Sequence, residues 1–234
     1  KIIEFNPDII LTSGWMCNDY LKLGRWFRKE KGLVVALSDS QFEGTVRQQL
    51  NCKLAPFRLH PSIDIIWTAG ERQREYAARL GYSGTHVWDG MLCPDWDNFA
   101  GQRLPTENRN KTFLFVGRFV PVKGINILVE AYRKYRERVK DEPWSLTCIG
   151  TGPQQAILEN EPGIALPGFI QPAQLPRSMA SAGSFVLPSL QEPWGVVLQE
   201  AATLGLPLIA TDACGAAVHM LRDGWNGFLT ETGN

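Results

Sequence analysis

The chain has 234 residues, of which 44% are hydrophobic and 21% charged, so it can bury a sizeable core and is not an intrinsically disordered protein. It carries 24 Lys and Arg and 24 Asp and Glu, and this zero net charge provides no general attraction to nucleic acid. The length fits one large domain or two small ones.

The first half of the chain alternates between short apolar segments and amphipathic ones. Strands are predicted at residues 8–13, 33–37, 63–69 and 85–90. Helices are predicted at 18–32, 44–52 and 71–82, with Asn18 as an N-cap and Gly32 and Gly81 at helix ends. Residues 91–111 are polar and contain prolines and glycines, which is typical of a linker between two lobes.

The same alternation resumes after the linker. Strands are predicted at 112–117, 144–150, 184–189, 205–212 and 226–230, and helices at 125–140, 172–183 and 195–203, with Pro176 in a first turn. Continuous apolar strands that alternate with helices favour parallel sheets covered on both faces. The predicted fold class is therefore α/β, with two doubly wound lobes at 1–103 and 104–234. In such lobes, ligands bind beyond the C-terminal ends of the strands.

Several kinds of site and segment are disfavoured. No apolar stretch approaches 18 residues, so no membrane span is predicted, and no signal peptide is predicted either. The five cysteines are scattered without a Cys-x-x-Cys pair, which fits a reducing compartment and neither a disulfide framework nor a zinc site. The basic run 133–138 is interpreted as a solvated helix face, with a membrane-surface contact as the alternative. Because the chain begins at Lys1 and not at Met, we expect it to be a fragment with an incomplete N-terminal lobe.

Two glycine-bearing loops follow predicted strands of the second half. Gly117, Arg118, Lys123 and Gly124 combine a loop that permits close approach with two cations, which suits a phosphate, although a solvated turn is equally compatible. The order Lys-Gly is not that of a Walker loop. Gly150 and Gly152 open a second turn, but the third glycine of a dinucleotide fingerprint is missing, which disfavours a nicotinamide enzyme.

Glu192 and Glu200 bracket the start of the predicted helix at 195–203. Such a helix directs free backbone N–H groups toward the strand ends, where an anionic or hydroxyl-rich ligand could bind. Glu192 could accept hydrogen bonds from sugar hydroxyls. Glu200 lies in an otherwise apolar helix, where a buried carboxylate is costly without partners. Helix geometry alone also permits a solvent-facing Glu200.

Residues 112–234 resemble the C-terminal lobe of retaining glycosyltransferases with the GT-B fold, most closely glycosyltransferase family 4. The resemblance includes FVGRFVPVKGINILVEAYRK, TCIGTGP, PGFIQPAQLP, FVLPSLQEPWGVVLQEAATLGLPLIATD and RDGWNGFL, in the family's order and spacing. It also includes the Glu-x7-Glu signature, here Glu192 and Glu200. It covers about half of the chain, and the set of motifs is specific although each is weak alone.

The resemblance implies a role for each matching residue. Arg118 and Lys123 would bind the donor diphosphate, and Glu192 would contact the transferred sugar. Glu200 would hold the ribose hydroxyls, and the segment Gly168-Phe169-Ile170 would lie against the nucleobase. The remaining implied donor-binding positions, several acting through backbone amides, are Gly117, Gly152, Trp194, Gly195, Val196 and Val197. The resemblance implies no metal and no cofactor. It implies a nucleoside-diphosphate sugar as co-substrate.

The N-terminal lobe resembles the family more loosely. The implied acceptor side contains Gly14, Trp15, Ser38 and Asp39, and Ser38 stands where the family often carries His. Val218 stands where the family carries a Glu. Asp95-Trp96-Asp97 mimics an Asp-x-Asp metal motif, but its place in a linker argues against metal binding. His60, His86 and His219 show no metal-ligand spacing, and no nucleophilic triad is evident.

The function implied by the resemblance is a retaining, metal-independent transfer of a sugar from a nucleotide donor to an acceptor hydroxyl. The acceptor would be a glycan, a lipid-linked molecule or a small molecule. The alternatives are a nucleotide-sugar epimerase of the same fold and an inactive nucleotide-sugar-binding homologue. No nucleic-acid partner is expected. The expected location is the cytoplasm, with at most a peripheral contact to the inner face of a membrane. The nucleobase, the sugar, the acceptor and the oligomeric state are left open.

Overall fold

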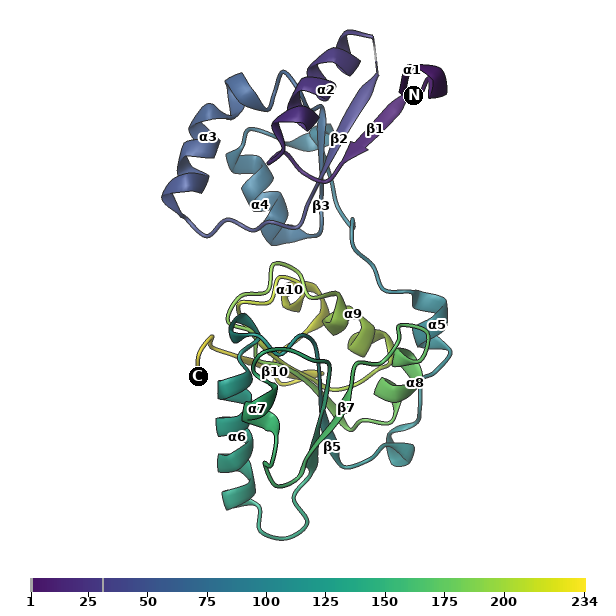
Figure 1. The fold of residues 1–234 in the computed structure, drawn as a ribbon, viewed down its shortest axis with the longest axis vertical. Helices are drawn as coiled ribbons and strands as arrows, with labels where there is room; N and C mark the ends of the chain where they lie inside the picture. The colour runs from purple at the N-terminus through teal and green to yellow at the C-terminus, as the bar shows by residue number, and fades with distance from the viewer. Residues whose placement is uncertain (1, 31) are drawn as a thin grey trace. The chain divides into compact units, whose positions relative to one another are not determined.

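The computed structural model describes residues 2–30 and 32–234, and it divides into two compact units, unit 1 (residues 1–92) and unit 2 (residues 93–234) (Figure 1). The sequence instead predicts a boundary at residues 103 and 104. The difference lies in α5 (Trp96–Ala100), which the polar composition of the linker did not predict. This helix contacts α8 and α9 of unit 2, so its residues belong to that unit.

The described residues of unit 1 form a four-stranded parallel sheet in the order β1-β2-β3-β4. Val34, Ala36 and Ile66 are fully buried at its centre, because apolar strands flanked by helices leave no water at the sheet faces. The elements are α1 (Ile2–Phe5), β1 (Ile9–Thr12), α2 (Asn18–Lys29), β2 (Leu33–Ser38), α3 (Val46–Arg58), β3 (Ile65–Thr68), α4 (Glu71–Arg79) and β4 (Val87–Trp88).

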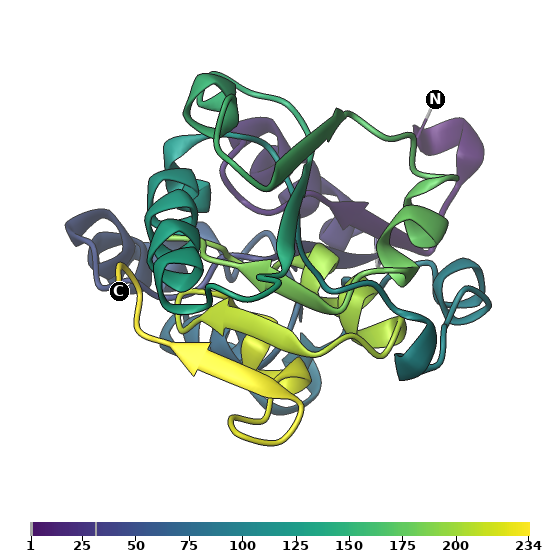
Figure 2. The same cartoon turned by 90° about the horizontal axis from the view of Figure 1, so that it is seen from below.

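The described residues of unit 2 form a six-stranded parallel sheet in the order β10-β9-β8-β5-β6-β7. Its remaining elements are β5 (Thr112–Val116), α6 (Ile125–Arg138), β6 (Ser145–Ile149), α7 (Gln155–Leu158), β7 (Ile164–Gly168), α8 (Leu175–Ala180), β8 (Ser184–Leu187), α9 (Val196–Thr203), β9 (Leu208–Thr211), α10 (Ala217–Met220) and β10 (Gly227–Thr230). Figure 2 shows β10 at one edge of this sheet, with β9 and β8 running beside it in the same direction. The helices form two groups by their contacts with one another. Helix α6 contacts α7, and α5, α8 and α10 contact α9.

Both predicted parallel sheets are confirmed, and so is the position of Pro176 within the first two residues of α8. Three predictions need correction. The helix that begins near residue 44 continues to Arg58 because Ala55 and the following Leu59 carry its buried face past Pro56. The strand β7 was missed, since its partly exposed residues give no apolar run. Asn18 is the first helical residue and not the N-cap, which is Cys17.

Candidate active site

The strand order of unit 2 reverses between β5 and β8, which pair with each other at the centre of the sheet. From β5 the chain proceeds outward to β6 and β7, and from β8 it proceeds the other way to β9 and β10. This is the doubly wound order that creates a crevice where the first two crossover loops separate. The loops after β5 and β8 contain Arg118, Lys123 and Glu192, so the strongest sequence candidates fall at this switch point.

Backbone contacts join these two loops to each other. The amide of Leu190 donates to the carbonyl of Val122 at 2.8 Å. Gly124 adopts the left-handed conformation (φ 70°), and an added Cβ would lie 2.0 Å from the carbonyl oxygen of Pro188. Only glycine permits that backbone approach and that φ together. The loop after β5 is thereby fixed against the loop after β8 at the candidate site.

The side chains of Lys123 and Glu192 form an ion pair through Nζ and Oε2. The pair is largely shielded, with 17% of the Lys123 side chain and 10% of the Glu192 side chain exposed to solvent. Buried Ser189 donates from Oγ to the same Oε2 at 3.1 Å. Thr211 in turn donates to the carbonyl of Ser189 at 2.6 Å. Both hydrogen bonds to the carboxylate go to Oε2, so within the described residues Oε1 is the acceptor atom that remains for a ligand.

The turn after Glu192 fixes the start of α9. Gly195 has φ 95°, and an added Cβ would lie 2.9 Å from the Cys214 sulfur. The Trp194 ring is buried, and its Nε1 donates to Oε1 of Gln199 at 2.9 Å. With the turn held in this way, the first amides of α9, from Val196 and Val197, lie at the positive end of the helix dipole.

Arg118 and Glu200 differ from the shielded pair in their surroundings. The Arg118 side chain is exposed, and Glu200 is half-buried. Burial raises the pKa of the Glu200 carboxyl, because a low-dielectric environment disfavours its charged form. No hydrogen bond from a described residue reaches either side chain. A planar guanidinium and a carboxylate with unused capacity are both suited to contact a polar ligand.

The other predicted donor-side residues lie in loops at the same edge of the sheet. The amide of Gly117 donates to Ile149 at 3.0 Å, and that of Gly150 to Gly168 at 2.9 Å, which joins the ends of β5, β6 and β7. An added Cβ on Gly152 would lie 2.5 Å from the Phe119 carbonyl oxygen. Phe169, directly after β7, is 65% exposed, and Ile170 is half-buried.

Unit 1 contains a hollow of about 460 Å³ at the carboxyl ends of β1 and β2. All four predicted acceptor-side residues line it, namely Gly14, Trp15, Ser38 and Asp39. The remainder of its lining is mostly polar and includes Arg47, Gln48 and Asn51 of α3. A hollow with this lining can offer hydrogen bonds to a hydroxyl-bearing molecule.

The structure also places Val218, which departs from the resembled family, and the His and Asp residues considered as metal ligands. Val218 is 45% exposed on α10, and the ring of His219 lies 5.6 Å from that of Trp194. Asp95, from the Asp-Trp-Asp sequence, accepts a hydrogen bond from the Asn98 amide at 3.4 Å as the N-cap of α5. Among the described residues, no group of three or more His, Cys, Asp or Glu side chains could hold a metal ion.

Three residues of the candidate site were missed by sequence reasoning. Ser189, Gln199 and Thr211 hold Glu192 and Trp194 through buried hydrogen bonds. Ser189 and Gln199 lie within seven residues of Glu192. Their polar side chains in an otherwise apolar stretch were therefore the available signal.

Unit 2 also contains a hollow of about 730 Å³ that lies away from the candidate site. It is lined by Gly183, Pro207 and Gly227, among others, at the amino ends of the strands.

The two parallel Rossmann-like sheets define a two-lobed α/β protein of the GT-B fold. The chain belongs to the family "Glycosyl transferases group 1", which matches residues 110–234. It is 28% identical over 162 residues to an uncharacterized glycosyltransferase of Methanocaldococcus jannaschii, covering 65% of this chain and 40% of the relative. It is 32% identical over 161 residues to the phosphatidyl-myo-inositol mannosyltransferase of Mycobacterium leprae, covering 66% and 42%. The chain thus spans about two fifths of these curated relatives.

Solved structures of similar fold cover nearly the whole chain. The Anabaena protein HepE in complex with UDP superposes with a TM-score of 0.76 at 19% identity, over 99% of this chain and 67% of that one. The pneumococcal O-GlcNAc transferase GtfA, in complex with UDP and GlcNAc, gives a TM-score of 0.69 at 16% identity, over 98% and 47%. At these identities the likeness shows the fold alone. Within the described residues, no helix has the length and apolarity that crossing a membrane requires.

Proposed function

We propose that the protein is a retaining glycosyltransferase that moves a sugar from a nucleoside-diphosphate sugar to an acceptor hydroxyl without a metal ion. The observation that carries this proposal is the shielded pair of Lys123 and Glu192 at the switch point between β5 and β8. A cation for a diphosphate and a carboxylate for sugar hydroxyls lie side by side there. Membership of the glycosyl transferases group 1 family supports the same assignment.

In the proposed reaction, the bond between the sugar C1 and the diphosphate oxygen breaks, and the acceptor oxygen attacks C1 from the same face. The acceptor proton passes to an oxygen of the leaving phosphate, so no covalent protein intermediate forms. Negative charge accumulates on the leaving diphosphate. Lys123, Arg118 and the first amides of α9 would stabilise that charge, because they are oriented before the reaction begins. Glu192 would hold the transferred sugar through Oε1.

Glu200 and the loop at Phe169 would hold the rest of the donor. A ribose hydroxyl can donate to the Glu200 carboxylate, which supplies the partner that a half-buried charge needs. The exposed Phe169 ring offers an apolar surface to a nucleobase. The lined hollow of unit 1 is the proposed acceptor side. The five free cysteines fit a reducing, cytoplasmic compartment.

An inactive nucleotide-sugar-binding homologue is the second candidate. It is favoured by Ser38, which stands in the acceptor-side hollow where the resembled family often carries His, and by exposed Val218 in place of a Glu. Both changes remove groups that could act on the sugar, while the diphosphate-side residues are retained.

A melting-temperature screen with UDP-, GDP-, ADP- and dTDP-sugars, followed by product analysis with the labelled donor, tests the proposal. Since a ligand that binds only the folded state at 100 times its Kd stabilises by about 2.7 kcal/mol, the true donor should raise Tm by several degrees. Label transferred to an acceptor supports the enzyme. Binding without turnover across an acceptor panel favours the inactive homologue, and no shift with any sugar nucleotide would overturn the donor site itself.

A further inference from the structure

The C-terminal end of α9 is closed first by its own backbone. The amide of Leu206 donates to the carbonyl of Ala201 at 3.1 Å, and that of Gly205 donates to Ala202 at 2.9 Å. With Gly205 at φ 71°, these two hydrogen bonds form a Schellman cap. The carbonyls at the very end of the helix are left for other donors.

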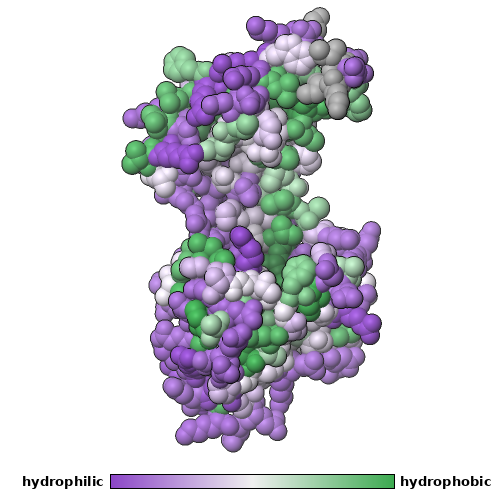
Figure 3. All heavy atoms as spheres, in the orientation of Figure 1, coloured by the Kyte–Doolittle hydropathy of each residue, from purple (hydrophilic) through white to green (hydrophobic). Residues whose placement is uncertain are grey.

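Two arginines from the segment between α5 and β5 supply those donors. Arg103 donates from Nε to the carbonyl of Thr203 at 2.8 Å. Arg109 donates from Nη1 to Gly205 at 2.8 Å and from Nη2 to Leu204 at 3.2 Å. Figure 3 shows mostly hydrophilic residues along the right-hand edge of unit 2, where this segment runs in Figure 1. The segment is thus joined by polar contacts to the end of α9 that is opposite the candidate donor site.

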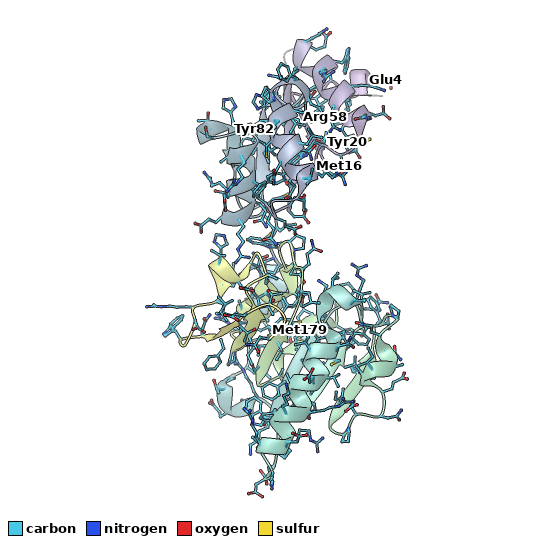
Figure 4. All side chains as sticks on the ribbon, turned by 90° about the vertical axis from the view of Figure 1, so that its left-hand side faces the viewer. Glu4, Met16, Tyr20, Arg58, Tyr82 and Met179 are labelled. Atoms are coloured by element: carbon cyan, nitrogen blue, oxygen red, sulfur yellow. The ribbon has the colours of Figure 1, made fainter. Side chains whose placement is uncertain are left out.

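Helix α9 is also packed along its sides. It contacts α5 and α8, and Met179 of α8 is fully buried within unit 2 (Figure 4). Leu198 and Ala201 on α9 itself are fully buried as well. A helix of eight residues is about 12 Å long, so holding its C-terminal end also fixes its first amides. Those amides belong to Val196 and Val197.

The two arginines are poorly arranged for a contribution to stability alone. Burial, together with the like charge of neighbouring Arg103, lowers the pKa of the Arg109 guanidinium. The Nε of Arg109 is buried and has no hydrogen-bond partner among the described residues, which costs free energy. The geometry satisfies the carbonyls of α9 although it leaves part of Arg109 unpaired. This favours a role in placing the helix.

We infer that Arg103 and Arg109 are positioning residues of the donor site. They act through α9, because they hold its C-terminal end and thereby keep the amides of Val196 and Val197 directed at the donor diphosphate. The inference rests on the proposed function, since it requires α9 to bind the donor. Negative charge accumulates on the diphosphate only as the sugar leaves. A displaced α9 would therefore stabilise the transition state less.

The test compares kcat and donor KM of the full-length protein with those of Arg103→Met and Arg109→Met, well below the melting temperature of each. Arg109→Met should lower kcat by about 10- to 100-fold, because a misplacement of ~1 Å costs up to 10²-fold in rate. Arg103→Met loses one hydrogen bond and should lower kcat by about tenfold or less. In both variants kcat should fall more than donor KM rises, since the amides act on charge that appears in the transition state. Arg103 is exposed, so its variant decides the test if Arg109→Met does not fold.

Lysine substitutions separate charge from geometry. Arg103→Lys keeps a single cationic donor and should recover most of the lost kcat, whereas Arg109→Lys lacks the planar fork that reaches two carbonyls and should recover little. Arg136→Met is the matched control, because Arg136 on α6 donates to the carbonyl of Pro162 and contacts no part of α9 through that bond. It should transfer sugar at the parent rate.

Arginine variants that lose only melting temperature and keep the parent kcat would overturn the inference, because the arginines would then stabilise the fold without placing α9. An equal loss of kcat in Arg136→Met would also overturn it. The proposed transfer fails separately, if the parent protein binds the donor but transfers no sugar. Calorimetry then replaces kcat, and Arg109→Met should bind the donor about fivefold more weakly. An unchanged donor Kd would overturn the inference, and a parent that binds no sugar nucleotide would overturn both.

Discussion

Lys123 and Glu192 are separated by 68 intervening residues, yet they share an ion pair that solvent barely reaches. Removing two charges from water costs free energy that the attraction within a buried pair often does not recover. The ion pair therefore gives little reason to expect a gain in the stability of the fold. We propose instead that the pair belongs to the donor-binding site between β5 and β8. A diphosphate would compete for Lys123, and a sugar hydroxyl would occupy the free oxygen of Glu192. The hydrogen bond from Ser189 would keep the Glu192 carboxylate oriented when such a ligand binds.

At the residue scale, Lys123→Ala should lower sugar transfer by roughly 10²-fold or more, if a preorganised charge contributes ~3 kcal/mol to the transition state. It should also lower Tm, because Glu192 is left buried without its partner. The double variant Lys123→Ala/Glu192→Gln should recover Tm but not transfer. Lys111→Ala is the control, since Lys111 forms an exposed pair with Glu142 at 3.1 Å. Near-normal turnover of Lys123→Ala would contradict the proposed role.

A second prediction at this scale concerns Glu200 and pH. Burial raises the pKa of this carboxyl in the folded protein, so the folded state holds a proton that the unfolded chain releases. Stability is therefore lost as the pH rises from the ordinary carboxyl range through the raised pKa. Glu200→Gln cannot ionise and should melt at a higher temperature than the parent near neutral pH. The difference should vanish below about pH 4, where both forms are uncharged.

The same variant should bind the donor more weakly, because the amide replaces the proposed acceptor of the ribose hydroxyls. Paired melting curves with and without the donor, recorded across this pH range, measure both effects. A melting difference that does not change with pH would show that desolvation of Glu200 is not its cause.

At the scale of elements, the strands and long helices follow from their patterns, whereas three features depend on packing. Helix α3 passes through Pro56 because Ala55 and Leu59 are buried on its inner face. Strand β7 forms although its residues are partly exposed, since β6 provides a pairing edge. Helix α5 forms within a polar stretch because α8 and α9 cover it. In each case a tertiary neighbour supplies what local propensity lacks.

The close approach of two loops at Gly124 gives a prediction at this scale. Gly124→Ala should destabilise the protein by more than the ~1–2 kcal/mol of a left-handed alanine, because its Cβ would lie 2.0 Å from the Pro188 carbonyl oxygen. It should also weaken donor binding by displacing Lys123. Gly224→Ala is a matched control, since Gly224 has φ 71° with nothing within 4 Å of the added Cβ. Denaturant unfolding of both variants measures the difference, and equal losses would exclude the contact as the cause.

At the scale of the whole molecule, all the proposed donor contacts lie in unit 2, and the proposed acceptor hollow lies in unit 1. A chain of residues 93–234 should therefore bind the sugar nucleotide without unit 1 and should not transfer the sugar. Calorimetry with the donor identified by the melting screen checks this, with Lys123→Ala in the same chain as the negative control. Transfer by unit 2 alone would show that the hollow of unit 1 is not the acceptor side.

The order of apolar strands and amphipathic helices was enough to predict two parallel sheets, because that periodicity admits few other folds. The motifs with Arg118, Lys123, Glu192 and Glu200 were enough to indicate the family. Which groups meet was decided only by tertiary structure. Lys123 meets Glu192 because Gly124 lets the loop after β5 lie against Pro188 in the loop after β8. Buried Ser189 then donates a hydrogen bond to the Glu192 carboxylate. The exposure of the apolar residues Val46, Leu50, Leu54 and Phe57 on α3 likewise becomes known only from the tertiary structure, since a linear pattern does not distinguish a covered apolar residue from an exposed one.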